Sequence, residues 1–348
     1  MDKIIEEDVL KIAKNLQEFK SKISGQTFLV TGGAGFLGSW FCDVLDFFEA
    51  KIICVDNLVT GSKENIKQLI GKPNFRFIQH DITKPLEIDG EIDYVINMAS
   101  IASPPVYQKF PIETLNTNIL GTIHLLDFAR SKNVKAFLFT STSEVYGDPP
   151  EEKIPTPETF PGLVSSFGPR AMYDEGKRAA EAYLYSYDKE FGKPPIRIAR
   201  IFNTYGPRLD VKETAKYGRA LMKFIIQALK NQPMTIYNQG KQTRSFCYIT
   251  DQVEGLFRLL LTPNIDGEIF NIGNENEISI LELTKILIEK TKSKSIIQQI
   301  EKTEYNVKGD PMRRCPDISK AKEVLGYNPK VPLEYGLLRT ADWVRQNL

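Results

Sequence analysis

A short strand that runs into a glycine-rich turn and then into a helix is the feature that most restricts the fold of this chain. Residues 26–31 form a buried-strand pattern, the turn is Gly32-Gly-Ala-Gly-Phe-Leu-Gly38, and the residues up to Phe48 have an amphipathic helical pattern. Gly32, Gly35 and Gly38 stand where a tight turn, a close approach to a pyrophosphate and close helix–strand packing require that a side chain be absent. The sequence therefore predicts a dinucleotide-binding turn.

A second strand, at residues 51–55, ends in Asp56. In dinucleotide-binding domains an acidic residue roughly 20 residues beyond the glycines bonds the ribose of adenosine. The carboxylate repels a 2′-phosphate, so the sequence predicts NAD rather than NADP as the cofactor. The alternative is a glycine-rich turn that holds no ligand.

Strands and helices then alternate along the chain. Strand patterns occur at residues 75–79, 93–97, 136–140 and 195–202, and long helical patterns at 111–131 and 171–191. This alternation predicts an α/β fold, a Rossmann-type doubly wound parallel sheet that is covered by helices on both faces. Ligands bind at the carboxyl ends of such strands, where the chain has Asp56, Asp81, residues 98–100 and residues 140–144.

The pattern changes after residue 203, where short elements are separated by loops rich in Asn, Gly and Pro. We predict an N-terminal amphipathic helix at 1–25, a nucleotide-binding domain at 26–203 to which residues 244–262 return, and a smaller substrate-binding lobe at 204–348. The N-terminal helix has an apolar stripe that requires a cover, made of Ile5, Val9, Ile12, Leu16, Phe19 and Ile23. Packing on the chain's own body is favoured over a contact between subunits.

Charge and cysteine content exclude several classes of function. The 45 basic and 44 acidic residues nearly balance, which gives no electrostatic footprint for nucleic acid or a membrane surface. The four cysteines lack Cys-x-x-Cys spacing, and the two histidines, His80 and His124, have no clustered partner, so we predict structural histidines and no metal site. We expect a soluble protein of the reducing cytoplasm, since the N-terminus is too acidic for a signal peptide.

The pair Tyr173 and Lys177 predicts a catalytic base. Residues four apart share a helix face, and a nearby ammonium favours the phenolate, which then accepts a proton from a sugar hydroxyl. Tyr-x-x-x-Lys occurs three times, also at Tyr185 and Tyr237. Tyr185 lies further along the same helix and indicates packing, whereas Tyr237 precedes a turn, so we select Tyr173.

Cationic residues lie in or next to loops of the second lobe and its approaches: Arg208, Arg219, Lys241, Arg244, Arg313 and Arg314. Each is individually typical of a solvated surface charge. Collectively they indicate a pocket for a diphosphate and a carboxylate.

Several longer motifs resemble one enzyme family. They include Thr31-Gly-Gly-Ala-Gly-Phe-Leu-Gly38, Ser141-Thr-Ser-Glu-Val-Tyr-Gly-Asp148, Gly168-Pro-Arg-Ala-Met-Tyr-Asp-Glu-Gly-Lys-Arg178 and Asp310-Pro-Met-Arg-Arg314. From about residue 26 to the C-terminus the chain resembles the extended short-chain dehydrogenase/reductases, which act on nucleotide sugars with a resident NAD. Within that family it is most similar to the UDP-glucuronate decarboxylases, which form UDP-xylose.

The resemblance implies a set of site residues. The implied catalytic residues are Thr142, Glu144, Tyr173, Lys177 and Arg314. The implied cofactor-binding residues are Gly32, Gly35, Phe36, Leu37, Gly38, Asp56, Asn57, Asp81, Ile82, Met98, Ala99, Ser100, Thr140, Tyr173, Lys177 and Arg200. The implied substrate-binding residues are Ser103, Pro104, Ser143, Asn203, Arg208, Arg219, Tyr237, Arg244 and Arg314.

The pair Ser143-Glu144 is the most diagnostic part of the resemblance, because the family's dehydratases have Asp-Glu there and its simple epimerases usually lack both acids. The implied reaction is decarboxylation of UDP-glucuronate through a 4-keto intermediate with no net redox change. Ile101, residues 164–167 and the 209–218 loop depart from the family pattern and are expected near the sugar. The alternatives are a UDP-glucuronate 4-epimerase, another NAD-dependent nucleotide-sugar epimerase or dehydratase, and a non-catalytic NAD-binding sensor. The family also implies a homodimer that is joined through helices at 111–131 and 171–191.

Overall fold

A seven-stranded parallel sheet forms the centre of the computed structural model, which describes residues 2–209, 220–300 and 311–347. The strand order is β11-β6-β5-β4-β1-β2-β3, and every neighbouring pair is parallel. The strands are β1 (Thr27–Thr31), β2 (Lys51–Asp56), β3 (Phe75–Gln79), β4 (Tyr94–Asn97), β5 (Ala136–Thr142), β6 (Ile196–Ile201) and β11 (Glu268–Ile272). This confirms the predicted α/β fold.

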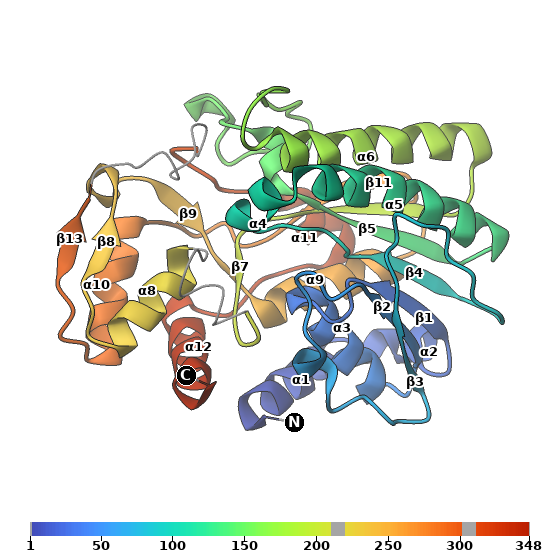
Figure 1. Cartoon of the computed structure of the whole chain (residues 1–348), viewed down its shortest axis with the longest axis horizontal. Helices are drawn as coiled ribbons and strands as arrows, with labels where there is room; N and C mark the ends of the chain where they lie inside the picture. The colour runs from blue at the N-terminus through green and yellow to red at the C-terminus, as the bar shows by residue number, and fades with distance from the viewer. Residues whose placement is uncertain (1, 210–219, 301–310, 348) are drawn as a thin grey trace.

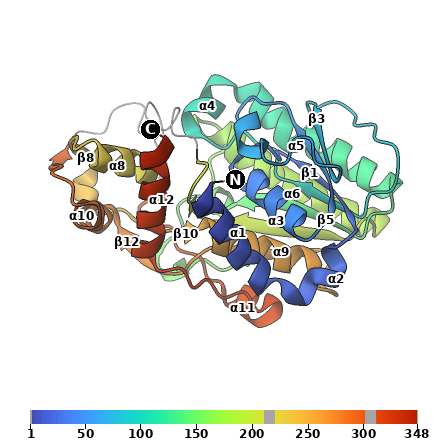
Figure 2. The same cartoon turned by 90° about the horizontal axis from the view of Figure 1, so that it is seen from below.

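Helices cover both faces of the sheet (Figures 1 and 2). On one face lie α5 (Pro111–Ser131) and α6 (Ala171–Phe191), and on the other lie α1 (Lys3–Asn15), α3 (Phe36–Phe47) and α9 (Ile249–Leu261). The side chains of the strands alternate between two apolar cores, as a period of two requires. In β5, for example, Leu138 packs on the side of α1, α3 and α9, whereas Phe137 and Phe139 pack on the side of α5 and α6.

The strand order reverses between β1 and β4, which lie side by side although β2 and β3 come between them in the chain. At such a point the connections leave in opposite directions, and a crevice opens at the carboxyl ends of the two strands. The residues after β1 are the glycine turn, and those after β4 are Met98, Ala99 and Ser100. The fold thus brings two predicted segments of the cofactor site together.

A smaller lobe stands beside the carboxyl ends of the sheet (Figure 1). It contains α8 (Ala220–Leu229), α10 (Ile280–Thr291), α12 (Leu333–Asn347) and two small sheets, β8 (Met234–Ile236) with β13 (Ile297–Gln299) and β9 (Thr243–Ser245) with β12 (Glu277–Ser279). The chain returns to the main domain through β10 (Cys247–Tyr248), which pairs with β7 (Thr204–Tyr205), then through α9, β11 and α11 (Ser319–Leu325).

The N-terminal stripe packs on the chain's own body. The structure divides the predicted single helix into α1, a 3-10 turn at Gln17–Phe19 and α2 (Lys20–Ile23), yet every apolar residue of the stripe is buried. Asp8 accepts a hydrogen bond of 2.6 Å from the Tyr248 hydroxyl and forms a 3.0 Å ion pair with Arg339 of α12. The N-terminal segment therefore ties the main domain to the C-terminal helix. Among the residues that the structure describes, no helix is long and apolar enough to cross a membrane.

Candidate active site

The glycine turn after β1 fits the diphosphate of a dinucleotide. Gly32 has a φ of +68°, and a Cβ there would lie 2.8 Å from the backbone of Met98 and Ala99. A Cβ on Gly38 would lie 2.2 Å from the Gly32 carbonyl oxygen, so these two glycines allow the turn to pack. A Cβ on Gly35 would meet only that same oxygen, at 3.0 Å, which leaves open space beside the start of α3. Gly35 is the N-cap of α3 and has no side chain to cap it, so the first N–H groups of the helix can bind phosphate.

Asp56 lies at the end of β2 and faces the glycine turn. Its carboxylate accepts hydrogen bonds from the backbone N–H groups of Ala34, at 3.0 Å, and Leu58, at 2.8 Å. Burial raises the pKa of Asp56, and these two hydrogen bonds partly offset that rise. The acid is therefore fixed beside the turn, with its next neighbours Asn57 and Leu58 in the loop that follows.

The other predicted cofactor residues lie along the same edge. Phe36 and Leu37 begin α3, and Asp81 and Ile82 follow β3. The Ser100 hydroxyl donates to Asn118 at 2.8 Å, and the Thr140 hydroxyl donates to the Asn97 carbonyl at 3.0 Å. The two histidines bond only main-chain oxygens in the described structure, His80 that of Lys84 and His124 that of Ile82. No group of three or more potential metal ligands occurs within residues 2–209, 220–300 and 311–347.

Tyr173 and Lys177 lie at the start of α6, next to the end of β5. The Lys177 ammonium donates a 2.7 Å hydrogen bond to the Thr140 carbonyl and lies 4.6 Å from the Phe139 ring centre. Burial lowers the pKa of Lys177 to about 7, and Glu181 opposes that shift. The Tyr173 ring is buried and stacks on Tyr107 at 5.4 Å between ring centres.

Burial separates the three Tyr-x-x-x-Lys pairs. Tyr173 is 7% exposed, whereas Tyr185 is 63% exposed and has Lys189 above its ring in solvent. Tyr237 precedes the 3-10 turn Asn238–Gly240, as the sequence suggested, and is half-buried. Of the three lysines, Lys177 donates to a carbonyl of β5, that of Thr140, and burial of Tyr173 and Lys177 favours the pair that we selected.

Glu144 is held between two arginines. It follows Thr142 in a 3-10 turn, Ser143–Tyr146, and the Thr142 hydroxyl accepts its backbone N–H at 3.2 Å. Arg314 donates to Glu144 at 2.9 Å and also to the Ser143 carbonyl, and Arg170 donates to the same carboxylate oxygen of Glu144. Burial raises the pKa of Glu144, but the positive charges of Arg314, Arg170 and Arg244 outweigh it, so the pKa lies below the usual range of a glutamate.

Sequence reasoning missed Arg170, Asp174 and Tyr107. Arg170 donates from its Nε to Asp174 at 3.2 Å, an i,i+4 pair in the first turn of α6. The Tyr107 hydroxyl is buried and has no hydrogen-bond partner in the described structure. The i,i+4 spacing of Arg170 and Asp174 was the available signal, because it places the arginine directly beside the Tyr173 motif.

Two predicted arginines form ion pairs with acidic side chains of the protein itself. Arg200 pairs with Glu181 at 2.7 Å and donates to the Glu158 carbonyl at 3.0 Å, which joins β6 to α6. Arg208 is 6% exposed and forms a 2.5 Å ion pair with Asp43 of α3. Their contacts with cofactor and substrate stay predictions.

The remaining predicted substrate residues are scattered around the same edge. Ser103 and Pro104 begin α4 (Pro104–Lys109), Asn203 lies between β6 and β7, and the half-buried Arg244 on β9 donates to its neighbour's carbonyl at 2.7 Å. Ile101 is buried against Tyr107 and Tyr173, which places this departure from the family pattern beside the Tyr173 ring. Arg219 and residues 210–218 lie outside the described residues.

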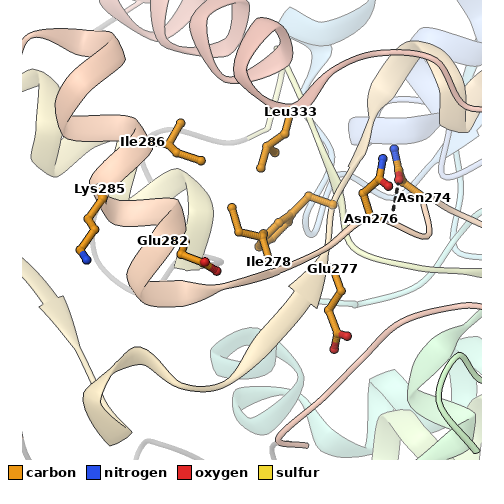
Figure 3. A pocket seen from close by; sticks show the side chains of 9 residues that line it. Asn274, Asn276, Glu277, Ile278, Glu282, Lys285, Ile286 and Leu333 are labelled. Carbon is orange, nitrogen blue, oxygen red and sulfur yellow. Dashed lines mark hydrogen bonds between the residues drawn. The ribbon is translucent and has the colours of Figure 1, made fainter.

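A separate cavity of about 430 Å³ lies in the smaller lobe, between α10, β12 and the start of α12. Figure 3 shows Ile278, Ile286 and Leu333 facing it, with Glu282 and Lys285 on α10. None of the predicted site residues lines this cavity. The cavity is therefore separate from the predicted site at the edge of the sheet.

A dinucleotide turn at the switch point of a doubly wound sheet, with a buried Tyr–Lys pair at the next strand end, defines an NAD(P)-dependent enzyme of the short-chain dehydrogenase/reductase type. The chain belongs to the NAD dependent epimerase/dehydratase family, whose model matches residues 28–273. This confirms the family that the motifs indicated.

Within this family, the chain is similar to several enzymes of named activity. UDP-glucuronic acid decarboxylase 3 of Arabidopsis thaliana is 46% identical over 310 residues, which cover 89% of this chain and 86% of the relative. UDP-glucuronic acid decarboxylase 1 of Xenopus tropicalis is 41% identical over 361 residues, which cover 100% and 82%. Among solved structures, the UDP-glucuronic acid 4-epimerase of Bacillus cereus in complex with UDP-glucuronic acid and NAD is 30% identical, with a TM-score of 0.77 and coverage of 93% and 100%.

Proposed function

We propose that this protein is an NAD-dependent decarboxylase that converts UDP-glucuronate to UDP-xylose without net redox change. The observation that carries the proposal is the Glu144 carboxylate, held by Arg314 and Arg170 beside the buried Tyr173–Lys177 pair. Simple oxidation at C4 of a sugar needs only the tyrosine, the lysine and a hydroxyl donor. Two guanidinium groups oriented by an ionised Glu144 add cationic donors that can place a substrate carboxylate. The relatives at 46% and 41% identity are named for this activity.

Oxidation at C4 is the first task of the site. The Tyr173 phenolate accepts the proton of the C4 hydroxyl, the Lys177 ammonium favours that phenolate, and the Thr142 hydroxyl orients the same oxygen by a hydrogen bond. The glycine turn and Asp56 would hold NAD, which would supply the hydride acceptor for C4 and the donor for its return. The product of this stage is a 4-keto sugar whose carboxylate at C6 is β to the carbonyl.

Loss of carbon dioxide follows from that ketone. The C5–C6 bond breaks, its electron pair moves into the ketone to form an enolate, and a proton is later added at C5. The protein must fix the carboxylate and stabilise the charge that develops on the ketone oxygen. We assign placement of the carboxylate to the guanidinium of Arg314, which Glu144 orients. Since the pKa of Glu144 lies below its usual range, Glu144 is an anion at neutral pH and orients groups rather than donating the proton.

Two rival functions share parts of the site. A UDP-glucuronate 4-epimerase would use Tyr173, Lys177 and Thr142 and turn the keto sugar before reduction, and the solved epimerase at 30% identity is a more distant relative than the decarboxylases. A non-catalytic NAD sensor would not need a buried lysine beside a tyrosine. The homodimer and the cytoplasmic location stay predictions. Exposed apolar residues on the outer helices are in keeping with a subunit contact, namely Ile112, Leu120 and Tyr183.

Product analysis tests the function directly. The purified protein, given UDP-glucuronate and no added oxidant, is expected to release carbon dioxide and accumulate UDP-xylose with no net NADH, as measured by mass spectrometry and absorbance. A product of unchanged mass with altered configuration at C4 would instead show epimerisation. No turnover in protein that binds NAD tightly would favour a different sugar or the sensor.

Cofactor choice is a second test, and it depends on Asp56. Cofactor-free protein is expected to bind NAD at least about tenfold more tightly than NADP, since the carboxylate repels a 2′-phosphate; tenfold corresponds to roughly 1.4 kcal/mol. Calorimetry measures both affinities. The matched variant is Asp56→Asn, which removes the negative charge, keeps an acceptor oxygen for one of the two N–H groups of Ala34 and Leu58, and should bring the NAD and NADP affinities closer together. If the wild type binds NAD and NADP with equal affinity, Asp56 does not select the cofactor and only holds the loop through Ala34 and Leu58.

A further inference from the structure

Arg170 is a second guanidinium on Glu144 and comes from a different part of the chain than Arg314. Arg314 approaches from the segment before α11, and Arg170 approaches from the turn that begins α6. Both donate to the same carboxylate oxygen of Glu144, and both side chains are largely buried, at 3% and 14% exposure. Two converging donors fix an oxygen in a way that one flexible arginine does not.

Asp174 fixes Arg170 in turn. The Asp174 carboxylate accepts from the Arg170 Nε at 3.2 Å, and its side chain is 7% exposed. Burial raises the pKa of Asp174 to about 6, with Arg170 opposing the rise and Glu144 adding to it. Asp174 therefore contacts Arg170, Arg170 contacts Glu144, and Glu144 contacts Arg314. We call these four residues, two negative and two positive at neutral pH, the Glu144 cluster.

The Glu144 cluster lies next to the residues that are proposed to act on the C4 hydroxyl. Asp174 is next to Tyr173 in the sequence, and Glu144 is two residues after Thr142. The ammonium of Lys177, by contrast, contacts the Thr140 carbonyl and the Phe139 ring. Loss of Arg170 would leave Asp174 buried without its ion pair and Glu144 with one fewer positive neighbour. Breaking a buried pair in this way leaves an uncompensated charge that moves to a new partner or takes up a proton.

We propose that Arg170 is a positioning residue for the decarboxylation step: it fixes the Glu144 carboxylate beside Arg314, and Asp174 fixes Arg170. This inference rests on the proposed function and names a residue that is absent from the implied site residues. It divides the work of the site into two parts. Thr142, Tyr173 and Lys177 serve oxidation at C4, whereas Arg170, Glu144 and Arg314 serve the loss of carbon dioxide.

Arg170→Met is the test, because methionine retains the aliphatic stem and removes the charge and the donors. We expect carbon dioxide release to slow by roughly 100-fold, the order of loss that a misplaced catalytic group causes. Oxidation at C4 should persist, so NADH accumulates transiently in a single turnover with UDP-glucuronate. Stopped-flow absorbance measures NADH, and quenched samples analysed by mass spectrometry measure the 4-keto acid and the decarboxylated product.

The pH dependence of the decarboxylation rate is a second measurement. A purely structural role of Arg170 would leave it unchanged. The groups that face Glu144 are Arg314, Arg244 and Arg170, with Asp174 on α6 and Tyr107 on α4 beside Arg170. Removing one positive neighbour raises the pKa of Glu144, so the acid limb of the rate profile should shift to higher pH in Arg170→Met. Arg170→Lys keeps the charge but cannot bridge Asp174 and Glu144, so it should restore the acid limb and only part of the rate.

Arg178→Met is the matched control. Arg178 lies two turns further along α6 and donates to the carbonyls of Val145 and Pro161. Its loss should leave the relative rates of oxidation and decarboxylation unchanged.

The inference is overturned if folded Arg170→Met slows both stages equally with an unshifted pH profile, or slows neither. Should Arg170→Met fail to fold, the partition and pH profile of Arg170→Lys decide. If the wild type binds NAD and releases no carbon dioxide from UDP-glucuronate, the proposed function fails and the inference falls with it.

Discussion

Replacement of Tyr173 by Phe is expected to abolish the NADH absorbance that appears when UDP-glucuronate is added. The phenol is the only group that the proposal assigns to take the proton from the C4 hydroxyl, and removal of a general base slows a reaction by roughly 10²–10⁴-fold. The ring keeps its stacking on Tyr107, so the variant should fold and bind NAD as the wild type does. Single-turnover absorbance measures the loss, and calorimetry with NAD checks the binding.

Tyr185→Phe and Tyr237→Phe are the matched controls, since each removes the hydroxyl of another Tyr-x-x-x-Lys pair. Tyr185 is exposed on α6, and its loss should have no effect on turnover. Tyr237→Phe should at most weaken substrate binding. A folded Tyr185→Phe variant as inactive as Tyr173→Phe would show that the wrong pair was selected.

Replacement of Glu144 by Gln is expected to separate the two stages of the reaction. The amide has the same size as the carboxylate, but it leaves Arg170 and Arg314 facing a neutral group, and loss of one partner of a buried pair is strongly unfavourable. Oxidation at C4 should continue, whereas carbon dioxide loss or protonation at C5 should slow by roughly 10²-fold, as for other misplaced groups. Mass spectrometry of quenched samples should detect the 4-keto acid.

Substitutions of Glu144 and of Arg170 are expected to cause the same intermediate to accumulate. Glu144→Gln and Arg170→Met should both accumulate the oxidised sugar, whereas Tyr173→Phe should accumulate nothing. A Glu144→Gln variant that releases carbon dioxide at the wild-type rate would remove Glu144 from the mechanism. One that fails to form NADH would assign Glu144 to the oxidation stage.

Six of the seven strands of the central sheet could be predicted from the sequence because their signals are local, whereas the edge strand β11 was not predicted. Each strand is a short apolar run, each crossover helix has its own periodicity, and the three glycines of the turn mark where the backbone must approach closely. Burial then explains why Tyr173 rather than Tyr185 is the catalytic candidate. That distinction was available from the sequence only through neighbouring motifs, since all three pairs have the same spacing.

The contacts of the arginines could not be predicted in the same way. Arg208 is predicted to contribute to a diphosphate pocket, and the structure adds an ion pair with Asp43, a residue of α3 far earlier in the chain, that the sequence did not indicate. Arg170 and Arg314 meet at Glu144 although 144 positions of sequence separate them. No local pattern encodes a pairing over such a distance, because it depends on how the smaller lobe lies against the sheet.

The buried Lys177 has a thermodynamic consequence for the whole fold. In the unfolded chain this amine titrates near 10.5, whereas in the folded protein burial lowers its pKa to about 7. Between these two values the unfolded chain holds more protons than the folded one, so Lys177 makes the free energy of unfolding increase as pH rises through that window. Below pH 7 both states are protonated, and the full penalty of a buried ammonium persists. The residue that activates the tyrosine thus destabilises the protein near neutral pH, an instance of stability given up for activity.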